Sequence, residues 1–326
     1  GFSGSAAIVT VTMTDVMLLT DFRYQEQVIH EVASMVRVII EAQSLWTRLW
    51  SVLPGLGGVE RMGFESSHLS HRDHGRLIES GSRWQWRATN DVVEALRERK
   101  DPGELACIRA AATIATSALE RTLPHCRPGM TELEIAGVLE HALRDAGSEG
   151  YPFETIVAAG ARSALPHARA SANIVCDGDL LLIDFGALHR GYCSDITRTV
   201  VLGRASAVQR EAYEVVRAAQ AVAVSEVRPG MTGRDADALA RSYIDRAGWG
   251  GAFGHSLGHG IGLEVHEAPR LARTADTPLC AGSVVTVEPG VYRPGWGGVR
   301  IEDDVYLGET GPEVLTHFAR ELIEII

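Results

Sequence analysis

Arg127-Pro128-Gly129-Met130-Thr131 recurs 101 residues later as Arg228-Pro229-Gly230-Met231-Thr232. Each copy precedes a helical pattern in which the Thr is the predicted N-cap, and each helix is expected to end at an Ala-Gly pair, Ala146-Gly147 or Ala247-Gly248. Five matching residues with an in-phase helix end indicate an internal duplication. We therefore expect two similar halves that pack about a pseudo-two-fold axis.

Each half then carries two acidic residues on strand-like segments. In the first half, Asp184 ends an apolar strand and Asp195 lies on the strand that follows a short turn. In the second half, Glu288 and Glu302 occupy the same two positions around a Pro/Gly-rich turn at 294–298. The duplication therefore predicts that Asp184 corresponds to Glu288, and Asp195 to Glu302.

The expected strand pairing brings these acids together. A hairpin centred between His189 and Arg190 places Asp184 directly opposite Asp195, with Cβ atoms about 4.5–5.5 Å apart. Two like charges on a buried strand are costly unless a cation neutralises them or a proton is shared. Any one acid alone would more often be an exposed or ion-paired residue. Four acids at repeated positions in apolar strands instead predict a site for two divalent ions.

A glycine-rich segment, 254–262, supplies a candidate neutral ligand, His259. Its sequence, Gly-His-Ser-Leu-Gly-His-Gly-Ile-Gly, contains four glycines, which disfavour a helix and favour an extended strand where a ligand approaches the backbone. The segment also fits the G-x-S-x-G pattern of a serine hydrolase. That motif needs a helix directly after it, which the following His-Gly-Ile-Gly disfavours.

Four carboxylates and one imidazole form a ligand set that suits Mn²⁺, Co²⁺, Fe²⁺ or Zn²⁺. Two such ions about 3.5–4 Å apart can share a water, lower its pKa and polarise a carbonyl. The constellation therefore predicts hydrolysis of an amide or an ester.

Composition narrows the class of protein. The 326 residues suggest two domains, and a net charge of −11 argues against nucleic acid as a partner. The cysteines are five in number and include no C-x-x-C pair, which is typical of reduced thiols in a cytoplasmic protein. No apolar run reaches the length of a membrane helix, and no signal-peptide pattern is present.

The first 88 residues alternate strand-like and helix-like patterns and predict a small α/β domain. It begins with a hairpin over 6–20, followed by a helix over 22–34. Helices over 90–100 and 103–123 then begin the second domain, so we expect domains at 1–88 and 89–326. The chain runs straight into a strand without an initiator Met, and we expect that further N-terminal residues precede it.

Five segments together resemble the signature blocks of the pita-bread-fold metallopeptidases: Ile183–Ala187, Ser194–Thr199, Gly258–Glu267, Val287–Tyr292 and Val299–Asp304. This family includes Xaa-Pro dipeptidases (prolidases), Xaa-Pro aminopeptidases and methionine aminopeptidases. Leu18–Tyr24 and Gly63–Glu65 resemble its creatinase/prolidase-type N-terminal domain, here expected to lack its first strand and helix. The resemblance implies an α/β N-terminal domain followed by an α+β pita-bread catalytic domain, and it implies a homodimer.

The resemblance also implies roles for individual residues. It makes Asp184, Asp195, His259, Glu288 and Glu302 the ligands of two ions, most simply Mn²⁺, with Co²⁺ or Zn²⁺ as alternatives. Asp195 and Glu302 would bridge the ions, and Glu288 would also act as the general base for the bridging water, giving a metal-bridging hydroxide. His167 would contact the substrate near the scissile bond, and His266 would stabilise the developing oxyanion or the leaving proline nitrogen.

Substrate choice within the family turns on Arg270, with His255 nearby. Arg270 is placed like the prolidase arginine that binds the free carboxylate of proline, a charge-assisted contact, although an exposed loop arginine is the alternative. We therefore expect a dipeptidase for small peptides with proline at the second position. An Xaa-Pro aminopeptidase acting on longer peptides is the main alternative, and a non-catalytic pita-bread binding protein is a remote one.

Overall fold

The computed structural model describes residues 1–326, which form two compact units, Gly1–Val92 and Val93–Ile326. The boundary expected after residue 88 would fall within strand β5 (Gln85–Thr89). This strand pairs in parallel with β4 (Arg61–Glu65) as far as the Glu65–Thr89 pair, so the first unit continues past that point.

The first unit contains a three-stranded sheet in the order β1-β2-β3. The predicted hairpin is confirmed, because β1 (Ala7–Val11) pairs antiparallel with β2 (Val16–Asp21), and β3 (Arg37–Glu41) then pairs in parallel with β2. Its helical elements are η1 (Phe22–Tyr24), α1 (Gln27–Glu31), α2 (Leu45–Val52), η2 (Leu53–Gly55) and α3 (His71–Ser80). The core gathers Met17, Leu19, Leu49, Leu53 and Trp84.

Two predicted helices were too long. The helix expected over 22–34 is a short 3-10 turn, η1, followed by the five residues of α1, which has no side-chain N-cap and ends at an extended Val32. The helix expected over 90–100 is reduced to α4 (Glu94–Arg97), because Asp91 has a φ of 55° and Asp101 is extended. Neither backbone conformation is compatible with a helix that runs through it.

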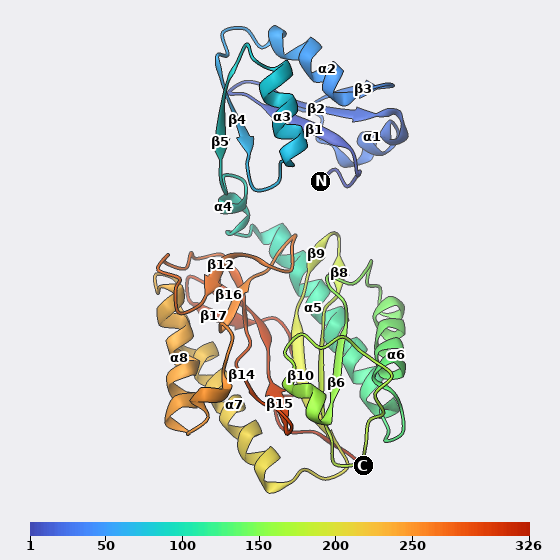
Figure 1. Ribbon diagram of the computed structural model, residues 1–326, viewed down its shortest axis with the longest axis vertical. Helices are drawn as coiled ribbons and strands as arrows, with labels where there is room; N and C mark the ends of the chain where they lie inside the picture. Colours follow the sequence, from blue (N-terminus) through green and yellow to red (C-terminus); the bar gives the residue numbers. More distant parts are fainter. The chain divides into compact units, whose positions relative to one another are not determined.

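The second unit confirms the duplication. In the first half, α5 (Pro102–Thr122) and α6 (Glu132–Asp145) precede the strands, and α7 (Ala207–Glu226) and α8 (Gly233–Arg246) do so in the second half. Thr131 and Thr232 cap α6 and α8 through equivalent capping boxes. Figure 1 shows α7 and α8 on one side of the strands and α6 on the other.

The strands form two main sheets. The first half has the order β18-β10-β7-β6, and the second has the order β12-β11-β13-β16-β17. The elements of the first half are η3 (Leu123–His125), β6 (Ile156–Ala159), η4 (Gly160–Ala164), β7 (Leu180–Phe185), β8 (Leu188–His189), β9 (Tyr192–Cys193) and β10 (Ile196–Leu202). Those that follow are η5 (Gly250–Ala252), β11 (Gly258–Gly260), β12 (Glu267–Leu271), β13 (Val284–Val287), β14 (Gly290–Arg293), β15 (Gly297–Arg300), β16 (Asp303–Gly308), β17 (Gly311–Val314) and β18 (Glu324–Ile325).

The two halves meet along β10 and the segment that joins β15 to β16. The hydroxyl of Thr199 donates to the carbonyl of Arg300 and accepts from its backbone N–H, at 3.0 and 3.1 Å. The backbone N–H of Glu302 donates to the carbonyl of Thr197 at 3.1 Å. Every residue of β7 and β10 is buried, so acidic side chains on these strands lie away from bulk water.

None of the helices combines the length and the apolar character that a membrane span needs.

Candidate metal centre

In the first half, the predicted pairing of Asp184 with Asp195 was wrong by two residues. Asp184 pairs with Thr197, because the hairpin is centred between Arg190 and Gly191. These two residues have φ values of 51° and 79°, as a two-residue type I′ turn requires. Asp195 therefore lies diagonally to Asp184 across the two strands, on the same face as Thr197.

In the second half the two acids do lie across from each other. The pairs Val287–Asp303 and Gly290–Arg300 belong to one antiparallel register, which places Glu288 across from Glu302. The two halves thus share the order of three strands, β6-β7-β10 and β11-β13-β16, but differ in the register of their acidic residues.

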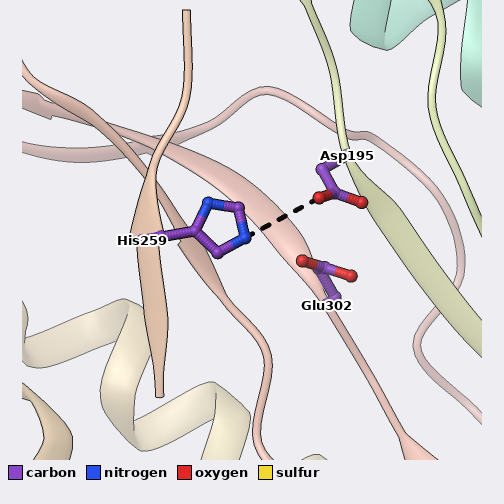
Figure 2. A group of neighbouring side chains, drawn as sticks. All are labelled: Asp195, His259 and Glu302. Carbon is purple, nitrogen blue, oxygen red and sulfur yellow. Dashed lines mark ion pairs between the residues drawn. The ribbon is translucent and has the colours of Figure 1, made fainter. Parts of the chain in front are cut away.

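The side chains of Asp195, His259 and Glu302 point toward one another (Figure 2), and one ligand atom from each lies within 4.8 Å of the others. His259 comes from β11, between Gly258 and Gly260. A Cβ atom at Gly258 would clash with the carbonyl of Thr286, and one at Gly260 with the carbonyl of Ala268. Glycine is therefore needed for the neighbouring strands to approach His259 this closely, and the predicted extended segment is confirmed for β11.

The imidazole of His259 is oriented as a neutral ligand. Its Nδ1–H donates to the carbonyl of Gly260 at 3.0 Å, so the lone pair of Nε2 faces the acids. Nε2 lies 3.5 Å from Oε1 of Glu288 and 3.8 Å from Oδ2 of Asp195. Burial lowers the pKa of His259 to about 4, and the charge of His266 lowers it further.

The carboxylates carry more negative charge than their surroundings neutralise. Burial, and then the charge of Glu302, raises the pKa of Asp195 well above its usual range. Burial, and then the charge of Glu288, has the same effect on the pKa of Glu302. Burial raises the pKa of Glu288 to about 8. A carboxyl group buried in such a place must be paired with a cation, bound to a metal, or neutral because it is protonated.

Two buried carboxylate oxygens in this cluster have no hydrogen-bond partner, Oδ1 of Asp184 and Oδ1 of Asp195. Buried oxygens without a donor are rare in native proteins and need a proton, a water or an ion. Hard oxygen ligands with one neutral imidazole are the donors that divalent ions such as Mn²⁺ and Zn²⁺ accept. The residues therefore fit a divalent metal site.

The other predicted site residues surround this cluster. His266 is exposed, and its ring centroid lies 4.3 Å from that of His259. Partial desolvation of the His266 ring by its neighbours lowers the pKa of His266; the charge of Asp184 raises this pKa and that of His167 lowers it. His167 is exposed on the segment after η4. Arg270 is exposed on β12, where its backbone pairs with His259. Paired residues of an antiparallel ladder project to one face, so Arg270 lies on the face of His259.

Tyr292 is a site residue that the sequence patterns did not reveal. Its hydroxyl accepts from Nη1 of Arg300 at 2.8 Å and donates to Nε2 of His255 at 2.9 Å. The Nδ1–H of His255 donates to the carbonyl of Ser256 at 2.8 Å, which assigns the tautomer. Burial lowers the pKa of His255 to about 4. Tyr292 ends the block Val287–Tyr292, but no pattern gave it a role, because His255 lies 37 residues away in the sequence.

Arg300 connects the two halves. Its Nη2 donates to Oδ2 of Asp184 in a short, buried ion pair, and its Nε donates to the hydroxyl of Thr197 at 3.0 Å. That hydroxyl donates to Oε2 of Glu302 at 2.6 Å. The period of two residues along a strand puts Arg300 on the face of Glu302, and Thr197 on the face of Asp195. This spacing is the sequence signal that points to both residues.

Comparison with known proteins gives a consistent result. The chain matches metallopeptidase family M24 over residues 106–309 and the creatinase/prolidase N-terminal domain over residues 1–99. An Xaa-Pro dipeptidase of Pyrococcus furiosus is 42% identical over 268 residues, which cover 82% of this chain and 77% of that protein.

Solved structures resemble the chain over nearly its whole length. An Xaa-Pro dipeptidase from Bacillus anthracis is 42% identical, with a TM-score of 0.96, over 99% of this chain and 90% of that one. An X-Pro aminopeptidase from Thermotoga maritima is 39% identical, with a TM-score of 0.92, over the same shares. The fold expected from the sequence, an N-terminal α/β domain and a duplicated pita-bread domain, is thereby confirmed.

Proposed function

We propose, since the chain belongs to metallopeptidase family M24, that it is a metal-dependent Xaa-Pro dipeptidase. The observation that carries the proposal is the convergence of buried carboxylates from both halves on one neutral imidazole, with two carboxylate oxygens left unpartnered. The residues that would hold two divalent ions are Asp184, Asp195, His259, Glu288 and Glu302. Ions held there supply an activated water and polarise the scissile carbonyl.

The chain's own residues would then move protons and orient the peptide. Glu288 is the most exposed of the four carboxylates, half-buried where the other three are buried, so it is the most accessible general base. His266, beside His259, would stabilise the negative charge that develops on the carbonyl oxygen or the leaving proline nitrogen. His167 would contact the peptide near the scissile bond. The hydroxyl of Tyr292 orients the side chains of both His255 and Arg300 through hydrogen bonds.

Arg270 supports a dipeptide substrate over a longer one. It is an exposed cation on the face of His259, where the free carboxylate of proline in a dipeptide would lie. A charge-assisted hydrogen bond of this kind contributes about 1.5–3 kcal/mol, or about 10- to 100-fold in affinity. An Xaa-Pro aminopeptidase remains the second candidate, supported by the similarity to the Thermotoga maritima structure.

The test compares Ala-Pro with Ala-Pro-Ala, using chelator-treated protein with Mn²⁺ added back. We expect hydrolysis of the dipeptide, and Arg270→Met should raise KM for Ala-Pro about 10-fold or more. Arg273→Met, another exposed arginine three residues on, is the matched control. Release of Ala from the tripeptide in preference to the dipeptide would establish the aminopeptidase. No turnover of either peptide by metal-loaded protein would favour the non-catalytic reading.

We further propose that the native ions are Mn²⁺, that the protein is cytoplasmic and that it forms a homodimer. The oxygen-rich ligand set supports Mn²⁺, and five free cysteines support a reducing compartment. The dimer rests on family resemblance alone. Metal analysis of freshly purified protein and light scattering after size exclusion test the first and third proposals, and a content dominated by Zn²⁺ or a monomeric mass would refute them.

A further inference from the structure

Glu132, the first residue of α6, has a carboxylate that is fully buried, with 0% of the residue exposed. Backbone N–H groups donate to it from Ala159 at 3.0 Å and from Ser171 at 3.1 Å. Side chains donate from Arg162, through Nε at 3.0 and 3.1 Å, from Ser171 at 2.7 Å and from Asn173 at 3.1 Å. Every one of these donors lies in the segment 159–173.

This segment has little regular structure of its own. After Ala159, the last residue of β6, it contains only the 3-10 turn η4, and no strand lies between residues 165 and 173. Backbone bonds support it beside the carboxylate, because the N–H groups of Glu132 and Leu133 donate to carbonyls of Asn173 and Ser171. A buried carboxylate with a paired arginine and four further hydrogen bonds is a stable organising point for such a segment. Glu132 therefore makes more hydrogen bonds to this segment than any other side chain outside it.

His167 lies in the middle of this anchored segment. On the side toward the metal centre, Nη1 of Arg300 donates to the carbonyl of Pro166 at 3.3 Å. On the helix side, the carboxylate of Glu132 holds the two flanks, Arg162 and Ser171. The segment is thus tied at both sides, while the imidazole of His167 itself stays exposed.

The second half shows that the fold does not require a carboxylate at this position. The residue that corresponds to Glu132 is Gly233, also the first residue of its helix, α8. A Cβ atom at Gly233 would clash with the carbonyl of Arg270, so the segment with His266 and Arg270 packs directly against the helix end. Glu132 is consequently a feature of the His167 segment and not of the duplicated scaffold.

We propose that Glu132 is a positioning residue, which holds the segment 159–173 so that His167 meets the peptide in a productive orientation. The catalytic role of His167 in this proposal rests on the proposed function; the anchoring of the segment by Glu132 does not. Displacement of a catalytic contact by about 1 Å can cost about 10²-fold in rate. Loss of the anchor should therefore lower kcat more than it raises KM.

The experiment uses the full chain loaded with Mn²⁺ and the isosteric variant Glu132→Gln, which replaces one acceptor oxygen by a donor. We expect faster hydrogen exchange of the amides in peptides spanning 159–173, and faster tryptic cleavage after Arg162 and Arg169. We also expect kcat for Ala-Pro to fall about 10- to 100-fold with bound metal unchanged. Glu132→Asp, which keeps the charge, should restore part of both losses.

Glu134→Gln is the matched control. Glu134 lies on the same turn of α6, but it is exposed and its carboxylate contacts only Thr131. This variant should leave exchange in 159–173 and kcat unchanged.

The exchange measurement tests the anchor even if the chain proves inactive on Ala-Pro, an outcome that would refute the proposed function separately. Unchanged exchange in Glu132→Gln would overturn the proposal. If the enzyme hydrolyses Ala-Pro, faster exchange in 159–173 together with an unchanged kcat would also overturn the proposal.

Discussion

In the first half of the second unit, a two-residue turn at Arg190-Gly191 leaves Asp184 opposite Thr197, whereas in the second half the turn at 294–296 places Glu288 across from Glu302. The first half therefore separates its acids and the second half opposes them. In each half, a buried carboxylate is stabilised by a group from the other half. Arg300 of the second half forms an ion pair with Asp184 of the first, and the hydroxyl of Thr197 of the first half donates to Glu302 of the second.

This exchange explains why a duplicated scaffold need not hold two equal sites. A single half would bury unpaired carboxylates, which is costly in a medium of low dielectric. The halves share helix caps and the order of three central strands, but the groups that compensate charge are not repeated. Their difference in register and in partners makes one site from two similar parts.

The largest expected effect follows from removing one acid from each half. Asp195→Asn and Glu302→Gln should each lower kcat/KM by about 10³-fold or more, because both groups meet His259 and loss of metal catalysis costs several kcal/mol. Peptidase assays with added Mn²⁺ check this. Glu313→Gln, at an exposed ion pair with Arg109, is the control. Full turnover by either variant would show that the halves do not share one site.

Arg300→Met tests the charge that the second half provides to the first. It leaves Asp184 buried without a partner, so the second unit should lose about 3–5 kcal/mol of stability in chelator-treated protein. The loss should be smaller with Mn²⁺ bound, because the ion neutralises the same carboxylate. Denaturation in both conditions, followed by hydrogen exchange of peptides from the second unit, measures the difference.

A matched control for this experiment is Arg109→Met, which breaks an exposed pair and should cost no more than about 1 kcal/mol. Equal destabilisation of Arg300→Met with and without metal would mean that Asp184 does not face the ions.

Thr197→Val tests the reverse contribution, from the first half to the second. It leaves Oε2 of Glu302 and Nε of Arg300 without this partner, which should cost about 1–3 kcal/mol. Metal affinity should fall about 10- to 100-fold, because the bond orients a proposed ligand. Titration of the chelator-treated protein with Mn²⁺ gives this value, and an unchanged affinity would contradict the role given to Thr197.

The smallest expected effect concerns the turn that causes the difference in register. Arg190 adopts a φ of 51°, which asparagine tolerates better than arginine, so Arg190→Asn should raise stability by about 0.5–1 kcal/mol. Chemical denaturation of the variant beside Arg190→Ala measures the change. A loss of stability specific to the asparagine variant would argue against the type I′ turn.

The patterns in the sequence were informative wherever the cause is local. The repeat of Arg-Pro-Gly-Met-Thr predicted two capped helices, and both capping boxes are present at Thr131 and Thr232. The glycines around His259 predicted an extended segment with close neighbours, and β11 has that form. Helix lengths near Asp91 were wrong, because a left-handed backbone conformation at one residue outweighs helix propensity over ten.

The register of the first hairpin shows why the site geometry was only partly predictable. Alternation along a strand assigns each side chain to a face, but a shift by two residues leaves every face unchanged. The apolar pattern therefore fitted both the predicted register and the observed one. The choice between them lies in the turn, where Arg190 is not a residue that signals a positive φ.

The sequence by itself determined the duplication, the two-unit plan and the candidate ligand residues, because periodicity, capping and glycine placement act over a few neighbours. Only the tertiary structure decided that Arg300 compensates Asp184, that Thr197 supports Glu302, and that Tyr292 joins Arg300 to His255. The first two contacts join strands about a hundred residues apart in the chain. Their partners are chosen by how the halves pack, which no local pattern specifies.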